Sequence, residues 1–269
     1  MGSLPFQGMC QINTHFISSR YQSMGNASVA LRDEQSLMSN PAGLMGTKKT
    51  SFILQSAWLY GVNDLKPLTV GAVIPSLSGT FGLLLNHLGF ENLRENTLGV
   101  SYARRFSDKL DAGIGLKYAH YSINSYGSKG VIGFDIGFNT LIFKDFYVGF
   151  HAQNPIPTQS NDANNLANVP STTASSIFRL GLSYRVNNLV LMSTEVKKDL
   201  SYPAAFRFGL EYKPVEKMAF RGGFETQPIK IAFGLGYCVS QILNVDVAVS
   251  SHSVLGVTPS LSINYFLKK

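Results

Sequence analysis

The chain has few cysteines, few charged residues and no long apolar run. Cys10 and Cys238 are its only cysteines, and two are too few for a disulfide framework or a metal-binding cluster. No stretch approaches the roughly 20 apolar residues that a membrane-spanning helix requires. Charged residues make up only 14% of the 269 residues, and the net charge of +7 comes from scattered basic residues. These features argue against a helical membrane protein and against nucleic acid as a partner.

Apolar and polar residues alternate through most of the chain, from about residue 50 to 267. The clearest copy is 205–213, in which large apolar side chains alternate with charges and glycine: Phe206, Phe208, Leu210 and Tyr212 against Arg207, Gly209, Glu211 and Lys213. Successive side chains of a strand point to opposite faces, so this two-residue period predicts a strand with one apolar face. The opposite face is polar, which is typical of a wall between lipid and a polar interior.

The pattern repeats often enough to predict fourteen strands. Their expected ranges are 49–60, 66–75, 79–88, 95–106, 109–123, 129–142, 145–153, 175–186, 188–198, 203–213, 217–226, 229–239, 242–251 and 255–267. The even count, and the alternation of tight turns with longer links, are typical of bacterial outer-membrane barrels. We therefore predict an all-β fold: a transmembrane antiparallel β-barrel of about 14 strands.

A soluble β-sandwich also alternates, and it is the competing fold. Its outer face would be rich in Lys, Glu and Thr. Here the charges recur on the face opposite the aromatic residues, often beside glycines. A Lys or Arg on a lipid-facing wall would cost about 2–4 kcal/mol at mid-membrane, so this sorting favours the membrane barrel.

Residues 1–48 lack the alternation and are predicted to form an N-terminal plug, with the barrel spanning 49–269. The segment 154–174 is the longest link and is expected to be an extracellular loop. The expected location is the bacterial outer membrane. No signal peptide is visible in 1–11, so we infer that a signal was removed or that the native start differs.

Several segments resemble the FadL-type outer-membrane superfamily, and most closely its PorV/PorQ-like branch from Bacteroidota. They are 24–30 (MGNASVA), the plug motif Asn40, Pro41, Ala42 and Gly43 before Leu44, and the strand phrases 98–103, 112–118 and 178–184. The resemblance implies a fourteen-stranded barrel with an N-terminal hatch. It implies one of two functions: transport of hydrophobic molecules, or partnership with type IX secretion proteins.

The short connections, without long apolar loops, favour the second function. The first hypothesis is therefore a non-enzymatic scaffold or partner in protein secretion or outer-membrane assembly. Its partners would be other outer-membrane or secretion proteins, and outer-membrane lipid and lipopolysaccharide would surround the wall. The alternative is a FadL-like transporter of hydrophobic small molecules. That alternative predicts an apolar ligand pocket with Phe16, Met24, Leu37 and Met45 as lining, and a break in the wall at Pro75.

Inward charges predict a second feature, an ionic network that fills the lumen. Its expected members are Arg179, Arg207, Glu211, Arg221 and Glu225. With the plug, this network is expected to block free diffusion; a wetted polar wall is the alternative. No enzyme signature or cofactor motif is present. The run from Ser250 to Ser253 contains His252, but neighbouring strand residues face opposite ways and cannot form a triad. We expect no enzyme activity, cofactor or metal.

Overall fold

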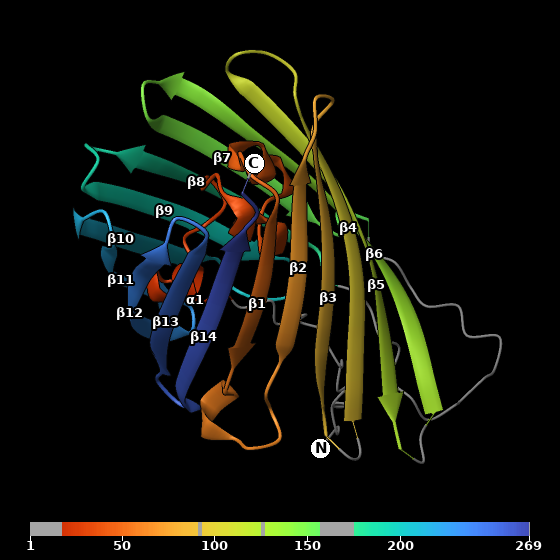
Figure 1. Ribbon diagram of the computed structural model, residues 1–269. Coiled ribbons are helices and arrows are strands. Elements are labelled where there is room, and N and C mark those ends of the chain that lie inside the picture. The colour runs from red at the N-terminus through yellow and green to blue at the C-terminus, as the bar shows by residue number, and fades with distance from the viewer. Residues whose placement is uncertain (1–17, 91–92, 125–126, 157–174, 269) are drawn as a thin grey trace.

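Fourteen antiparallel strands form a closed barrel (Figure 1). The structure is a computed structural model that describes residues 18–90, 93–124, 127–156 and 175–268. The strands are β1 (Ser51–Ala57), β2 (Leu68–Pro75), β3 (Thr80–Phe90), β4 (Leu93–Arg105), β5 (Leu110–Ile123), β6 (Gly127–Phe143), β7 (Phe146–Gln153), β8 (Ile177–Arg185), β9 (Val190–Asp199), β10 (Ala205–Val215), β11 (Met218–Thr226), β12 (Ile229–Ser240), β13 (Leu243–His252) and β14 (Gly256–Phe266). Each strand pairs with its sequence neighbours, and β1 also pairs with β14, so the sheet has no free edge. The predicted fold class and strand count are confirmed.

The two faces of the wall have the burial expected of a barrel in lipid. Large apolar side chains point outward, as with Ile231 and Phe233, which are 52% and 66% exposed. Charged side chains on the inner face are buried instead; Glu195 is 1% exposed and Glu211 is 0% exposed. A water-soluble protein has the opposite arrangement, because burying a charge is costly unless it is paired. The soluble sandwich is therefore excluded.

Residues 18–50, here called the inner segment, lie inside the barrel (Figure 1). They contain a short α-helix, α1 (Ser19–Ser23), and two 3-10 helices, η1 (Glu34–Met38) and η2 (Pro41–Gly46). The helix α1 packs against β11–β14, whereas η2 packs against β3–β6 on the other side of the barrel. None of the described helices is long and apolar enough to span a membrane. Residues 1–17 of the predicted plug lie outside the described residues.

The two rims of the barrel differ in their connections. One, the turn rim, carries 76–79, 106–109, 144–145, 186–189, 216–217 and 241–242. The other, the loop rim, carries 58–67, 200–204, 227–228 and 253–255, and includes the 3-10 helix η3 (Leu59–Gly61). Most of the predicted extracellular loop, 157–174, lies outside the described residues. Pro75 does not break the wall: it is the last residue of β2 and pairs with Thr80 beside a turn.

Candidate functional site

Inward glycines allow the inner segment to lie directly against the wall. A Cβ atom added at Gly113 would lie 2.5 Å from the backbone nitrogen of Ala42, and one at Gly223 would lie 2.3 Å from that of Gly25. Eight strands each contribute one glycine that would place a Cβ atom 2.7 Å or less from the inner segment: Gly82, Gly113, Gly137, Gly149, Gly181, Gly209, Gly223 and Gly234. We call these residues the glycine belt. Any side chain larger than hydrogen there would push the inner segment away.

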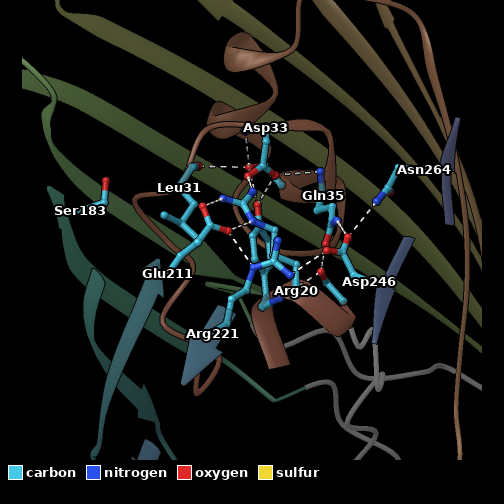
Figure 2. Close-up of polar contacts among 12 residues, drawn as sticks. Arg20, Leu31, Asp33, Gln35, Ser183, Glu211, Arg221, Asp246 and Asn264 are labelled. Carbon is cyan, nitrogen blue, oxygen red and sulfur yellow. Dashed lines mark hydrogen bonds and ion pairs between the residues drawn. The ribbon is translucent and has the colours of Figure 1, made fainter. Parts of the chain in front are cut away.

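Ion pairs fix α1 to the wall on one side of the barrel (Figure 2). Arg20 donates a hydrogen bond of 2.8 Å from Nε to the Glu211 carboxylate on β10, and it also pairs with Asp33 of the inner segment. The same Glu211 oxygen accepts from Arg221 at 2.7 Å, and Arg221 reaches Asp246 on β13, also at 2.7 Å. The inner segment and three strands therefore share one buried charge network.

A second ionic group forms nearer the loop rim. Arg207 on β10 donates to Glu195 on β9 at 2.7 Å and to Glu225 on β11 at 2.9 Å. The other oxygen of Glu195 accepts from the backbone nitrogens of Ser28 and Val29, each at 2.9 Å. Removing one partner of a buried ion pair typically costs about 3–5 kcal/mol, because the other charge is left uncompensated. These contacts therefore hold the inner segment as well as the wall.

Asn40 of the predicted plug motif joins the inner segment to β6. Its side-chain oxygen accepts from the Ala42 nitrogen at 3.1 Å and begins η2, with Pro41 in the first turn. Its side-chain nitrogen donates to the carbonyl oxygens of Val29 at 2.7 Å and Phe138 at 3.2 Å. Ala42 and Gly43 are buried in η2. Asn40 thus caps the start of η2 and also links the inner segment to β6.

Above the inner segment, a cavity of about 570 Å³ reaches the loop rim. We call it the mouth cavity. Its floor is made by inner-segment residues such as Tyr21, Gln22 and Ser39, and its rim includes Tyr60, Tyr202 and His252. Among the described residues, the charged lining consists of five cations, Lys117, Arg179, Lys197, Arg207 and Lys230, and two acids, Asp199 and Glu225. A cavity of this composition favours negative charge.

The predicted apolar lining does not gather around this cavity. Leu37 packs in one apolar cluster with Leu44, Ile53 and Val73, and Met45 lies against that cluster. Met24 belongs to a separate cluster with Tyr21, Leu31 and Leu191. Phe16 lies outside the described residues. The three described residues therefore act as packing between the inner segment and the wall, and their role in ligand binding stays a prediction.

The predicted charge network divides in the structure. Arg207 and Glu225 are direct cross-strand partners, as are Glu211 and Arg221, and both pairs are in contact. Arg179 lies apart from them and makes no ion pair within the described residues. The sequence reasoning missed Glu195, Lys197 and Arg20. Glu195 and Lys197 could have been found, because they alternate with Val196 on the polar face of their strand.

Residues that could suggest an enzyme have structural contacts instead. The Nδ1 atom of His252 accepts from the backbone nitrogens of Val254 and Leu255, both at 3.1 Å, and so closes a turn. The Ser250 hydroxyl accepts from the Gln22 side chain at 2.8 Å. Among the described residues, no group of three or more His, Cys, Asp or Glu side chains could hold a metal ion.

Comparison with known proteins relates the fold to outer-membrane channels. No protein-family model and no curated protein sequence matches the chain. Among solved structures, the CymD monoaromatic hydrocarbon channel matches with a TM-score of 0.74 at 14% identity, over 94% of this chain and 98% of that one. The Ralstonia pickettii toluene transporter TbuX matches with a TM-score of 0.72 at 15% identity, over 94% and 98%. A Pseudomonas aeruginosa FadL homologue matches with a TM-score of 0.68 at 12% identity, over 93% and 98%.

These likenesses extend over nearly the whole length of both chains. At such low identity they establish the fold and nothing finer. They lend no support to the PorV/PorQ-like branch, which stays a prediction. The chain therefore has the fold of the FadL-type outer-membrane barrels.

Proposed function

We propose that the protein is an outer-membrane channel that admits small molecules through the mouth cavity. The observation that carries this proposal is the combination of a FadL-type barrel with a cavity of about 570 Å³ inside it. That volume lies within the range of about 300–1,000 Å³ typical of small-molecule sites. The similar solved structures include a monoaromatic hydrocarbon channel and a toluene transporter, which favours transport over the secretion role. The loop rim would face outward and the turn rim the periplasm.

Passage beyond the mouth cavity requires the inner segment to move, because its residues form the cavity floor. One place suits such a movement. Met24 and Gly25 lie against the bare backbone of Gly209 and Gly223, which are cross-strand partners on β10 and β11. Outside the wall at this height lies a groove lined by Phe208, Leu210, Phe224, Ile231 and Phe233, into which Gly222 contributes no side chain. At this height Gly209 and Gly223 place no side chain between the inner segment and the wall.

The secretion-partner function lacks a comparable observation in the part of the chain that the structure describes. Its proposed recognition surface, 154–174, is mostly outside those residues. A partner role would require stable complexes in the native membrane. Gentle detergent extraction from that membrane, followed by identification of co-purifying proteins, tests it directly.

Proteoliposome uptake tests the channel. The purified barrel is reconstituted, and entry of radiolabelled toluene, benzyl alcohol and benzoate is measured against protein-free vesicles and against vesicles with an unrelated closed barrel. We expect uptake that saturates with concentration and depends on the protein. Uptake no faster than in both controls, for every neutral and charged probe offered, would overturn the proposal.

A further inference from the structure

Two cations face each other across neighbouring strands in the mouth cavity. Arg179 on β8 and Lys197 on β9 are direct cross-strand partners, and both line the cavity. Like charges placed directly opposite each other destabilise a strand pair. Glu195, two residues before Lys197 on β9, has no such repulsion. Its cross-strand partners are Gly181 on β8 and the cation Arg207 on β10. The Arg179–Lys197 pair therefore needs an explanation other than stability of the wall.

Neither cation is neutralised within the described residues. Arg179 reaches only the Ser39 hydroxyl at 3.5 Å and the Gln153 side chain at 3.4 Å, and its buried Nε atom has no partner. Lys197 makes no hydrogen bond or ion pair with any described residue. The other cations of the cavity differ: Lys117 pairs with Asp135 at 2.5 Å, and Lys230 lies 3.7 Å from Glu225.

The nearby acids are already used. Glu195 is shared between Arg207 and the backbone nitrogens of Ser28 and Val29. Asp199 lies two residues after Lys197 on β9, and it accepts a hydrogen bond of 3.0 Å from the Ser201 nitrogen. The wall thus presents two cations side by side while its own carboxylates are directed elsewhere. An anion placed between the two side chains would neutralise both charges.

We propose that Arg179 and Lys197 bind the anionic group of a small molecule in the mouth cavity, a carboxylate or a phosphate. The planar guanidinium can donate two parallel hydrogen bonds to such a group, and the lysine ammonium adds a point charge. The apolar and aromatic lining of the same cavity, including Leu59, Tyr60 and Ile177, suits a compact organic body. The proposal rests on the proposed channel function and narrows its ligands to small organic anions.

Calorimetric titration of the purified barrel in detergent tests the site without any transport step. The probes are benzoate, the neutral benzyl alcohol of similar size, and inorganic phosphate. We expect benzoate to bind more tightly than benzyl alcohol. Arg179→Gln and Lys197→Gln should each weaken benzoate about tenfold or more, with benzyl alcohol unchanged. Lys217→Gln removes one charge from the turn rim and should leave both probes unaffected. If wild type also binds phosphate and both variants lose that binding, the site accepts free inorganic oxyanions as well as organic carboxylates.

Stability without ligand gives a second readout. If Lys197 is kept for binding, Lys197→Gln should raise the unfolding temperature of the ligand-free barrel, because it removes the repulsion with Arg179. A structural role would lower it instead. Benzoate binding no tighter than benzyl alcohol, or equal in wild type and both variants, would overturn the anion site. In that case, uptake of neutral probes would still support the channel function. Conversely, benzoate binding without uptake of any probe would support the anion site and contradict the channel function.

Discussion

Arg20 of the inner segment donates a hydrogen bond of 2.8 Å to Glu211 of the barrel wall, across 191 positions of the chain. The Glu211 carboxylate is fully buried and also accepts from Arg221. This contact ties the segment that forms the cavity floor to a strand that forms the wall. If the inner segment moves away from the wall on this side, the hydrogen bond between Arg20 and Glu211 must break, unless Arg20 stays in place.

Arg20→Met should loosen the inner segment without unfolding the barrel. Glu211 keeps Arg221 as a partner, so we expect a loss of about 1.5–3 kcal/mol, the usual contribution of hydrogen bonds to charged groups. The temperature at which the compact band converts on an unboiled SDS gel measures stability, and bilayer conductance should increase. Arg94→Met, which removes an exposed arginine from β4, is the matched control. An identical effect of both substitutions would contradict an anchoring role for Arg20.

Gly222 and Gly223 are neighbours on β11 and provide a second matched pair. A Cβ atom at Gly223 would lie 2.3 Å from the Gly25 nitrogen, whereas one at Gly222 would meet nothing nearer than 3.7 Å, an atom of Phe233. Gly223→Ala should therefore displace the inner segment, lower the unfolding temperature and raise permeability to a small dye. Gly222→Ala should leave both unchanged. Equal behaviour of the two variants would show that the inner segment does not rest on the glycine belt.

The lipid-facing wall can be tested with two positions of equal exposure on β12. Leu235 is 48% exposed and Val239 is 49% exposed, so a water-exposed surface would tolerate lysine equally at both. Leu235 lies in mid-strand and Val239 near the turn rim. Leu235→Lys should cost about 2–4 kcal/mol and Val239→Lys about 0–1 kcal/mol, measured by reversible folding into lipid vesicles. The same small cost at both positions would be inconsistent with a membrane-spanning wall.

Strand positions were predictable because alternation is a local property. The range 109–123 predicted β5 (Leu110–Ile123) to within one residue, since turn residues bound a continuous two-residue period. The range 129–142 fell short of β6 (Gly127–Phe143) because Gly127 and Ser128 give no apolar signal. Closure between β1 and β14 followed from the prediction of a membrane barrel, whereas the register of that pair depends on contacts far apart in the chain.

The candidate site was harder to predict, for a physical reason. Arg207 and Glu225 could be paired from strand order, because both lie on inward positions of adjacent strands. The contact of Arg20 with Glu211, and that of Glu195 with the Ser28 nitrogen, could not, because each involves the inner segment, which has no periodicity and folds back into the barrel. Arg179 was placed in the ionic network, yet its cross-strand partner is Lys197. Sequence alternation gives the face of a residue but not the register that selects its partner.

A last prediction concerns pH. Burial of Glu34 at the start of η1, with Asp33 beside it, raises the pKa of the Glu34 carboxyl from 4.5 to about 7. Between about pH 4.5 and 7 the folded protein therefore binds one more proton than the unfolded chain, and stability falls as pH rises through that window. Glu34→Gln mimics the protonated form. It should match wild type near pH 4.5 and be more stable by about 1–3 kcal/mol at pH 8.

Unfolding temperatures in detergent at the two pH values measure this difference. Glu216→Gln, which replaces an exposed acid in the turn between β10 and β11, is the control and should change stability by the same small amount at both. A Glu34→Gln effect that is also independent of pH would show that the carboxyl titrates alike in the folded and unfolded chain. The expected pH-dependent gain would mean that the inner segment holds a protonated acid near neutrality, and that raising the pH weakens the floor of the mouth cavity.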